Sequence, residues 1–342
     1  MPLPSLRVAV LHYQPRGEPA DEVVGNITAA LKELGHEPLP VPVHDHIADM
    51  LENIQKSRCD IVFNVCETFA DDYRLEVNVA ALMEMARIPH TGSGTAGLLL
   101  AQDKIVTKQL LEYHEVQTPH FATFDGEAFE THGMLSFPLV VKPARSDSSI
   151  GIGKHSVVKD WDELTKRVRE IRRELQDEAL AEEYIDGREI YVSLLGPSMR
   201  PEILPLVEMD FGQWDPQKPR ISDREVKFGP ETAGSPRLVM AKDIAGVLRA
   251  RLERDAIIAY RALKLRDYAR IDFRVSATGE PYILEANPNP YLEKSSELAM
   301  AARERGLSYV QLLGRILESA ATRYRLNKKP AEAKPDGSGG TG

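Results

Sequence analysis

The chain has 342 residues, of which 42% are apolar, and a formal net charge of −9 with a pI near 5.6. This length and apolar content suffice for two or three modules with buried cores. The acidic balance, without a basic stripe, argues against nucleic acid as a partner, and no apolar run has the length of a membrane span. Because residues 1–15 also lack the pattern of a signal peptide, we expect a cytoplasmic protein.

Residues 1–101 alternate between apolar strands and amphipathic helices. The expected elements are a strand at 6–13, a helix ending at Gly35, a second strand, a helix at 46–58, a strand at 59–67 and a helix at 74–88. This alternation predicts a parallel sheet with helices on its faces. Cys59 and Cys66 lie in the third strand and are expected to be reduced thiols in the core.

The stretch HTGSGTAGLLLAQDK (90–104) contains G-x-G-x-x-G, the pattern of a dinucleotide-binding turn. That motif needs a strand before it and an acidic residue on a second strand about 20 residues further on. Only RIPHT precedes the glycines, and the nearest acids are Glu115 and Asp125. We therefore interpret the glycines as a turn into a helix over residues 96–114, which carries Lys104.

Antiparallel signals dominate the rest of the chain. The expected elements are two strands around a polar loop within 137–158, a helix at 160–176, two strands around a turn at 186–187, a long loop at 209–237, a helix at 245–265, a hairpin at 268–290 and a helix at 306–324. We divide the chain into an N-terminal α/β substrate domain (1–101), a central subdomain (102–185), a C-terminal subdomain (186–326) with a lid loop at 210–237, and a disordered tail (327–342).

Two carboxylates and one amide are expected to meet on the C-terminal hairpin. Glu285 and Asn287 are two residues apart, so they share a face of their strand, and Asp272 on the neighbouring strand can lie beside them. Such oxygen ligands suit Mg²⁺, which takes its other ligands from water and phosphate. The alternative is a solvated polar hairpin, although the apolar neighbours in YIL and IDF favour partial burial.

Positive charges from two modules suggest a triphosphate site. Lys142 ends the apolar strand FPLVVK, where it is either an exposed strand end or a donor into a site, and Lys104 is expected on a helix. The loop SDSSIGIG can add backbone N–H groups and the hydroxyls of Ser148 and Ser149. Each of these signals is weak when taken singly.

The strings GSGTAGLLLAQDK, FPLVVKPARSDSSIGI, AEEYIDGREI, YARIDF, LEANPNP and GLSYVQLLGRIL occur in one order along residues 60–317. In this order and wording the chain resembles the ATP-grasp enzymes, and among them the D-alanine–D-alanine ligases. The resemblance implies an N-terminal parallel-sheet module followed by a two-part ATP-grasp fold with antiparallel sheets. It also implies an ADP-forming ligase that uses ATP and two Mg²⁺ ions, or Mn²⁺, on small carboxylate and amine substrates. A homodimer is among the expected assemblies.

The same resemblance assigns roles residue by residue. It implies phosphate contacts from Lys104, Lys142, Ser149 and the lid residue Lys227; an adenine edge formed by Glu182, Glu183, Tyr184 and Ile185; a ribose contact from Glu189; a purine sandwich of Ile152, Phe273 and Leu284; metal ligands Asp272, Glu285 and Asn287; transition-state stabilisation by Arg270; a loop serine at Ser148; and amino-acid substrate contacts from Ser296, Tyr291 and Glu67.

Four departures from the family pattern fall on the amino-acid side. The glycine-rich segment with its glutamate is replaced by HYQPRGEPADEVVGN, where Glu18 or Glu22 could substitute. Phe228 replaces the lid tyrosine, NVCETFADDYR replaces a histidine–glycine segment, and Tyr291 stands near an expected oxyanion glycine. These changes predict ligase chemistry on altered substrates, with weak activity on D-alanine alone.

Four functions compete on the sequence. The first is a D-alanine–D-alanine ligase-type enzyme that makes a dipeptide for the cell wall or a secondary metabolite. The second is an ATP-grasp ligase for other carboxylates and amines. The third is a catalytically silent nucleotide-binding protein, which the intact Arg270, Asp272, Glu285 and Asn287 disfavour. The fourth, an NAD-dependent oxidoreductase, is disfavoured by the context of the glycine motif.

Overall fold

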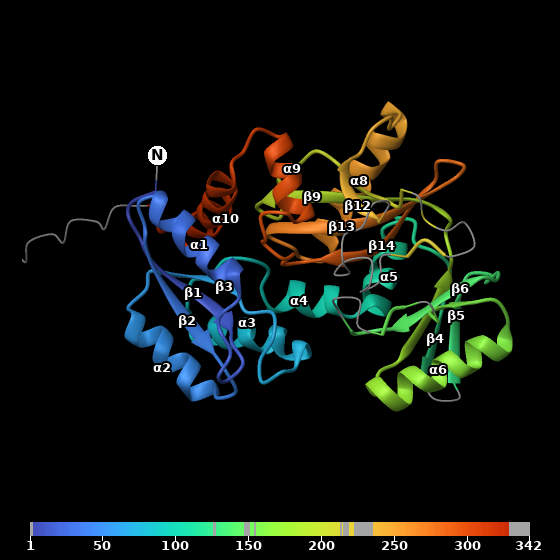
Figure 1. Cartoon of the computed structure of the whole chain (residues 1–342), viewed down its shortest axis with the longest axis horizontal. Coiled ribbons are helices and arrows are strands. Elements are labelled where there is room, and N and C mark those ends of the chain that lie inside the picture. The colour runs from blue at the N-terminus through green and yellow to red at the C-terminus, as the bar shows by residue number, and fades with distance from the viewer. Residues whose placement is uncertain are drawn as a thin grey trace, which may run out of the picture.

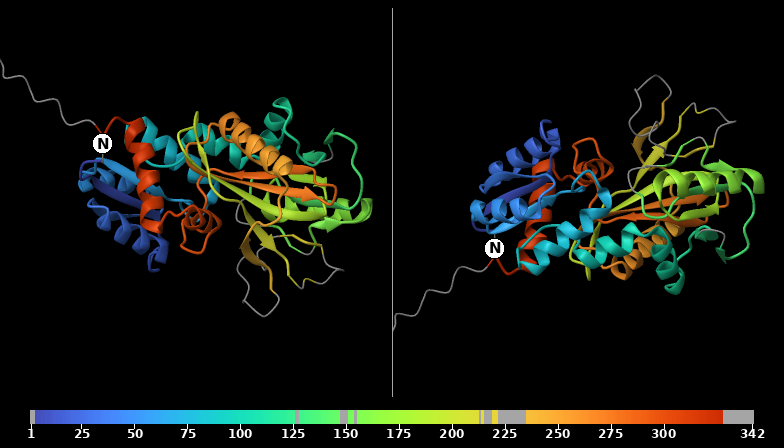
Figure 2. Two further views of the ribbon diagram at one scale, coloured as in Figure 1. Left: turned by 90° about the horizontal axis from the view of Figure 1, so that it is seen from above. Right: turned by 90° about the horizontal axis from the view of Figure 1, so that it is seen from below.

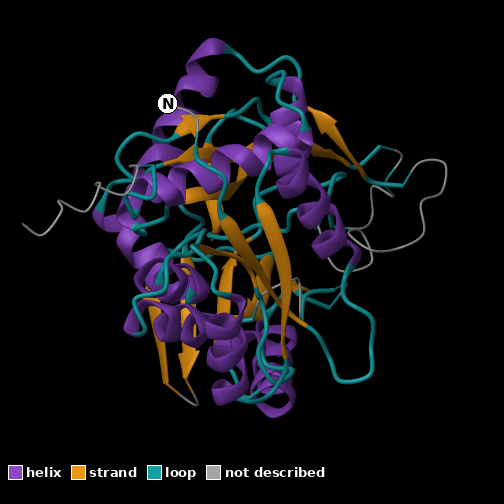
Figure 3. Cartoon of the chain, turned by 90° about the vertical axis from the view of Figure 1, so that its left-hand side faces the viewer, coloured by secondary structure: helices purple, strands orange, loops and turns teal. Residues whose placement is uncertain are grey.

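The computed structural model describes residues 3–125, 128–146, 151–153, 155–212, 214, 219–221 and 235–327. The strands of these residues form three sheets, one parallel and two antiparallel (Figure 1). Helices lie around the strands when the chain is seen from the end that carries the N-terminal domain (Figure 3). The predicted α/β class, with a parallel module followed by antiparallel sheets, is confirmed.

The N-terminal domain is a parallel sheet with strand order β2-β1-β3. Its elements are β1 (Arg7–Tyr13), α1 (Glu22–Glu33), β2 (Glu37–Val43), α2 (Ile47–Ser57), β3 (Ile61–Val65), the short helix η1 (Tyr73–Leu75) and α3 (Glu76–Met85). Because the central strand β1 is covered on both faces, its sequence VAVL is apolar without alternation. Cys59 and Cys66 are free thiols, as expected, but they flank β3 instead of lying in it, and only Cys66 is buried while Cys59 is half-buried.

The single helix expected over residues 96–114 is a pair, which corrects the prediction. It divides at Asp103 into α4 (Thr95–Gln102) and α5 (Lys104–Tyr113). Asp103 adopts extended backbone angles, and its carboxylate accepts hydrogen bonds from the N–H groups of Ile105 and Val106. The aspartate therefore acts as an N-cap that starts a new helix inside an otherwise continuous helical pattern.

The second sheet has the strand order β5-β4-β8-β6-β7. Its elements are β4 (Phe121–Asp125), β5 (Ala128–His132), β6 (Leu139–Pro143), β7 (Val157–Val158), α6 (Trp161–Leu175) and β8 (Ala179–Glu183). The antiparallel pairing of β6 with β7 confirms the expected hairpin. Leu139, Val141 and Ala181 face α6 in the core, so the alternate residues Lys142 and Glu182 lie on the opposite face.

The third sheet has the strand order β12-β11-β9-β13-β14, with β10 paired to β9. Its elements are β9 (Gly187–Gly196), β10 (Glu202–Ile203), β11 (Val207–Asp210), β12 (Arg237–Met240), α8 (Gly246–Ala262), β13 (Asp267–Ser276) and β14 (Pro281–Asn287). The hairpin of β13 and β14 around Gly279 was predicted and is confirmed. Two helices follow, the unpredicted α9 (Glu297–Glu304) and the predicted α10 (Tyr309–Arg323).

The last helix returns to the first domain. Helix α10 lies against α1, as the views from above and below show (Figure 2), and Leu313 and Ile316 share one core with Val8 and Ile27. The polar anchor of this arrangement is Asp267, which is fully buried at the start of β13. Its carboxylate accepts hydrogen bonds from the backbone N–H of Gly92, from the hydroxyl of Ser319 and from Arg323.

The glycine motif serves this same junction. Gly92 has φ +84°, a conformation that favours glycine, and a Cβ there would lie 2.5 Å from Oδ1 of Asn289. Arg266 donates to the carbonyl of Gly92, so the turn packs directly on the strand that begins at Asp267. Close backbone packing between modules therefore accounts for this glycine.

The domain limits remain predictions, and their positions can be compared with the observed elements. Residue 101 falls inside α4, and the limit between 185 and 186 falls between β8 and β9, which belong to different sheets. Most of the predicted lid (210–237) and almost all of the tail (327–342) lie outside the described residues. Among the helices that are described, none is long and apolar enough to cross a membrane.

Candidate active site

The two C-terminal strands bring the predicted metal ligands together. Asp272 on β13 lies directly opposite Glu285 on β14, and Arg270 lies opposite Asn287. The amide of Asn287 donates to Oδ2 of Asp272 over 3.1 Å, which leaves the amide oxygen as an acceptor. Asp272 is 3% exposed, so the alternative of a fully solvated polar hairpin does not describe this carboxylate.

The donor set is compatible with Mg²⁺. Asp272, Glu285 and Asn287 offer hard oxygen atoms from facing strands, the ligand type that Mg²⁺ takes together with water and phosphate. In the described part of the chain no group of three or more His, Cys, Asp and Glu side chains is arranged to hold a metal. The two carboxylates and the amide are the ligand types of a site that nucleotide phosphates would complete.

Arg270 is held between two carboxylates. Its Nε and one terminal nitrogen donate to the two oxygens of Asp272 over 2.7 and 2.9 Å, and its other terminal nitrogen donates to Glu297 over 3.0 Å. The guanidinium also lies 5.1 Å from the ring centre of Tyr191. Although burial opposes the charged form, the neighbouring carboxylates hold the pKa of Arg270 well above its usual value.

The placement of Phe273 corrects one sequence-based expectation. Side chains alternate along a strand, so Phe273 points to the face opposite Asp272. There it is fully buried with Ile190, Val192 and Ala256 in the core beneath α8. Phe273 therefore does not share a face with the metal ligands and is not available to sandwich a purine there.

Arg274 takes the place on the site face that the sequence analysis gave to Phe273. It pairs over 2.8 Å with Glu189, whose other oxygen accepts from the hydroxyl of Tyr191 over 2.6 Å. Glu189 and Arg274 are directly opposite each other on β9 and β13. The predicted ribose carboxylate is thus buried and held by two side chains that the sequence analysis did not single out.

A buried trio of charges joins α5 to the second sheet. Oε1 of Glu182 lies 2.6 Å from Nζ of Lys142, and Oε2 lies 2.8 Å from Nζ of Lys108. Burial lowers the pKa of Lys108, and it opposes ionisation of Glu182. The two ammonium groups outweigh that effect and hold the pKa of Glu182 below its usual value.

Lys108 was missed from the sequence, although a signal was present. Lys104 and Lys108 are four residues apart on α5, so they lie on one helix face, and both are buried. The ammonium of Lys104 donates to the backbone carbonyl of Ser146, at the end of the described part of the polar loop. Tyr73 of η1 also reaches this residue, with 2.7 Å between the hydroxyls of Tyr73 and Ser146.

The remaining nucleotide-side residues lie at the end of β8, in the link from β8 to β9, in the loop between β6 and β7, and on β14. The N–H of Glu183 donates to the backbone carbonyl of His120, and that of Tyr184 donates to the carbonyl of Pro138. The hydroxyl of Tyr184 accepts from the N–H of Arg220. Ile185, Ile152 and Leu284 are half-buried, and Leu284 lies at the β-bulge opposite Asp272 and Phe273. The predicted Ser148, Ser149, Lys227 and Phe228 lie outside the described residues.

The predicted amino-acid side lies between α9 and the N-terminal domain. Ser296 caps α9, and the hydroxyl of Tyr291 donates to Asp21, the N-cap of α1. Glu67 follows β3 and is exposed, between the buried side chains of Cys66 and Phe69. Of the two substitutes considered for the missing glutamate, Glu22 begins α1 next to Asp21, whereas Glu18 lies on the exposed loop before it.

The fold and the site define an ATP-grasp enzyme. A family model described as D-ala D-ala ligase C-terminus matches residues 109–318. The D-alanine–D-alanine ligase of Syntrophotalea carbinolica is 32% identical over 298 residues, covering 87% of this chain and 90% of that protein. An uncharacterized protein, y4sG of Sinorhizobium fredii, is 36% identical over 315 residues, covering 91% and 89%.

Solved structures agree on the fold. A D-alanine–D-alanine ligase from Bacillus anthracis complexed with ATP superposes with a TM-score of 0.72 at 23% identity, over 94% of this chain and 99% of that one. VanG D-Ala:D-Ser ligase from Enterococcus faecalis gives 0.69 at 20% identity, over 92% and 99%. The chain belongs to the D-alanine–D-alanine ligase family, and it is an ATP-dependent, ADP-forming ligase.

Proposed function

We propose that the chain joins a carboxylate to an amine through an acyl phosphate, with Mg²⁺ held by Asp272, Glu285 and Asn287. The observation that carries this proposal is the pairing of Asp272 with Glu285 and of Arg270 with Asn287 on adjacent strands. Bound Mg²⁺ would neutralise charge on the phosphates and on the transferred phosphoryl group. Mn²⁺ is the expected substitute, because it accepts the same oxygen ligands.

The reaction proceeds in two steps. A carboxylate oxygen attacks the γ-phosphorus of ATP, which forms an acyl phosphate and releases ADP. The amine nitrogen then attacks the acyl carbon, the carbon–oxygen bond to phosphate breaks, and the amide, inorganic phosphate and one proton are released. This chain's contribution is to position the reactants and to stabilise negative charge, with Lys104 on α5, Lys142 on the second sheet and Arg270 on the third.

The departures on the amino-acid side favour substrates other than two D-alanines. Tyr291 is joined to Asp21 rather than leaving an open glycine position, and Glu67 follows β3. We expect weak turnover with D-alanine alone and faster turnover with an unlike pair, for the cell wall or for a secondary metabolite. A kcat/KM of at least ~10⁴ M⁻¹s⁻¹ on D-alanine alone, ordinary for an enzyme on its own substrate, would show that the departures are neutral.

The decisive experiment is phosphate release from ATP across a panel of D- and L-amino acids with Mg²⁺, with product masses measured. Asp272→Asn and Glu285→Gln should each lower turnover by about 10²–10³ or more without unfolding the protein. Glu208→Gln is the matched control, because Glu208 pairs with Arg188 in the same sheet, away from these ligands. Unchanged turnover in both site variants would contradict the metal assignment.

A cytoplasmic location and a homodimer complete the proposal. ATP-consuming ligation of small molecules suits the cytoplasm, where ATP is made. Light scattering of the purified chain measures its mass directly, and a mass of about 38 kDa would rule out the dimer.

A further inference from the structure

A row of charged and polar side chains lies on the face of the third sheet that carries the metal ligands. Because side chains alternate along a strand, Arg270, Asp272 and Arg274 all project from this face of β13. On β9, Tyr191 lies directly opposite Asp272, and Glu189 lies directly opposite Arg274. The row therefore leads from the metal ligands to the carboxylate that is expected to contact the ribose.

Two side chains of this row fix the carboxylate of Glu189. The hydroxyl of Tyr191 donates to Oε1 over 2.6 Å, and a terminal nitrogen of Arg274 lies 2.8 Å from Oε2. Glu189 is 5% exposed, Tyr191 1% and Arg274 3%. A buried carboxylate without a cation beside it is strongly unfavourable, so Arg274 is the residue that stabilises Glu189 in this place.

The guanidinium of Arg274 is itself held in one orientation. One terminal nitrogen donates to the carbonyl of Gly187 over 3.2 Å, and the nitrogen that faces Glu189 also donates to the carbonyl of Arg220 over 2.7 Å. The central carbon of the guanidinium lies 5.9 Å from the ring centre of Phe211. A planar fork with several donors can make these contacts together, whereas the single ammonium of a lysine could not.

The backbone of Arg220 connects this arginine to the predicted adenine edge. Its carbonyl accepts from Arg274, and its N–H donates to the hydroxyl of Tyr184 over 2.8 Å. Tyr184 directly follows β8, in the link that leads to β9. Arg274 is therefore joined to the residues predicted for both parts of the nucleoside, directly to Glu189 and through Arg220 to Tyr184.

We propose that Arg274 is a positioning residue for the nucleotide: it fixes Glu189 so that the carboxylate accepts the ribose hydroxyls of ATP, and it thereby sets a preference for ribonucleotides. The inference rests on the proposed function, which takes this face of the third sheet as the nucleotide site. A carboxylate can accept about four hydrogen bonds, so the contacts with Tyr191 and Arg274 do not use up its capacity. Because the carboxylate is already fixed, it loses little side-chain freedom when a hydroxyl binds.

The test compares two nucleotides that differ only in the ribose. Binding of ATP and of 2′,3′-dideoxy-ATP, each with Mg²⁺, is measured by isothermal titration calorimetry on the full chain, so no amino-acid substrate has to be known. We expect the wild type to bind ATP at least about tenfold more tightly, the usual effect of a hydrogen bond to a charged group. Arg274→Met should bring the two affinities to within about threefold of each other.

Further variants separate positioning from other roles. Glu189→Gln should lower the same ratio of affinities, and adding Arg274→Met to it should lower the ratio no further, because the arginine acts through the glutamate. Arg274→Lys retains the charge beside Glu189, which protects the fold if Arg274→Met unfolds. It cannot make all the contacts of the guanidinium, so its ratio should lie between the wild-type value and one.

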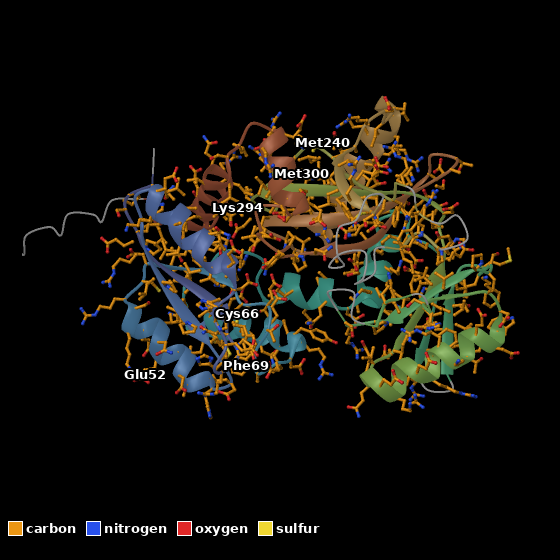
Figure 4. The ribbon with its side chains drawn as sticks, in the orientation of Figure 1. Glu52, Cys66, Phe69, Met240, Lys294 and Met300 are labelled. Atoms are coloured by element: carbon orange, nitrogen blue, oxygen red, sulfur yellow. The ribbon has the colours of Figure 1, made fainter. Side chains whose placement is uncertain are left out.

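Arg188→Met is the matched control. Arg188 pairs with Glu208 over 2.6 Å in the same sheet, and alternation along β9 places it on the face opposite Glu189. Arg188 also donates to the carbonyl of Lys242, two residues beyond Met240, which Figure 4 labels. It thus has a carboxylate and a carbonyl as partners, as Arg274 has, and its replacement should leave the wild-type ratio unchanged.

Three results would overturn the inference. They are equal affinities of the wild type for the two nucleotides, a wild-type ratio in either folded variant of Arg274, and additive losses in the double variant, which would show that the arginine contacts the nucleotide independently of Glu189. The proposed function fails by a different result. If ATP binds with the expected preference but no carboxylate and amine release phosphate from it, the ligation is overturned and the role of Arg274 in nucleotide binding stands.

Discussion

Glu182 is a buried carboxylate shared between two lysines. Glu182 is 2% exposed, Lys108 is 1% exposed and Lys142 is 5% exposed. A buried carboxylate with two ammonium partners leaves one net positive charge, which suits a site for an anionic nucleotide. Removing the carboxylate would leave two buried like charges unpaired, which strongly lowers the stability of the folded protein.

We therefore expect Glu182→Gln to lower the free energy of unfolding by about 3–5 kcal/mol at neutral pH. The folded-state pKa of Glu182 lies below its ordinary value of 4.5, so this stabilisation is complete above that value. It is lost as the pH falls through the folded-state pKa, because the wild-type carboxyl is then protonated too. In urea unfolding at decreasing pH, the gap between the two proteins should narrow once the pH falls below 4.5.

A surface glutamate offers the control. Glu202 also lies between two cations, Arg305 and Arg315, but its side chain is 29% exposed. Glu202→Gln should cost no more than about 1 kcal/mol, since exposed ion pairs contribute little. Equal losses in the two variants, or a gap for Glu182→Gln that does not close at low pH, would contradict the importance of burial.

At the level of elements, the sequence predicted individual strands and helices from their periodic patterns, but it did not predict which distant elements pack against each other. The parallel N-terminal sheet and the hairpin of β13 and β14 follow from strand–helix alternation and from the turn at Gly279, and both are confirmed. Asp272, Glu285 and Asn287 could be grouped because a hairpin fixes their register. Lys108 and Glu182 could not, because α5 and β8 are brought together only by tertiary packing.

Two other failures have local causes. Phe273 was assigned from the family resemblance, but alternation along β13 sends its side chain to the face opposite Asp272. Helix α9 was missed because it has only 8 residues, and its start depends on the cap at Ser296. For Phe273, the alternation of side chains along a strand would have improved on the family resemblance.

The cap at Asp103 gives a prediction for α5. Asp103→Ala should lower the free energy of unfolding by about 1 kcal/mol, the usual loss for an N-cap. It should also raise the KM for ATP, because it loosens the first turn of the helix that carries Lys104 and Lys108. Asp160→Ala is the control: Asp160 caps α6 through the N–H groups of two residues in the same way.

Thermal unfolding and steady-state kinetics on both variants decide the matter. Similar losses in stability with a higher KM for ATP only in Asp103→Ala would support a positioning role for the cap. Asp103 also pairs with Arg145, so Arg145→Met shows whether that exposed pair, rather than the cap, is responsible. An unchanged KM in Asp103→Ala would show that the helix start does not position its lysines.

At the level of the whole molecule, the first and last parts of the chain share one core, whereas the second sheet has its own. The shared core joins β1, α1, α9 and α10, and its polar anchor Asp267 binds Gly92, Ser319 and Arg323. The core between α6 and the second sheet contains Leu139, Val141 and Leu164. Substitutions in these two cores should therefore affect different parts of the chain.

Two buried leucines allow a matched test of this division. Leu313 on α10 is 0% exposed in the shared core, and Leu164 on α6 is 1% exposed in the core of the second sheet. Each Leu→Ala substitution should cost about 2–5 kcal/mol locally. Leu313→Ala should speed amide hydrogen exchange in β1, at the opposite end of the sequence, while Leu164→Ala should speed it in β6 and β8 and leave β1 protected. Equal acceleration of β1 by both variants would show that the three sheets unfold as one unit, and the separate core of the second sheet would then have no independent stability.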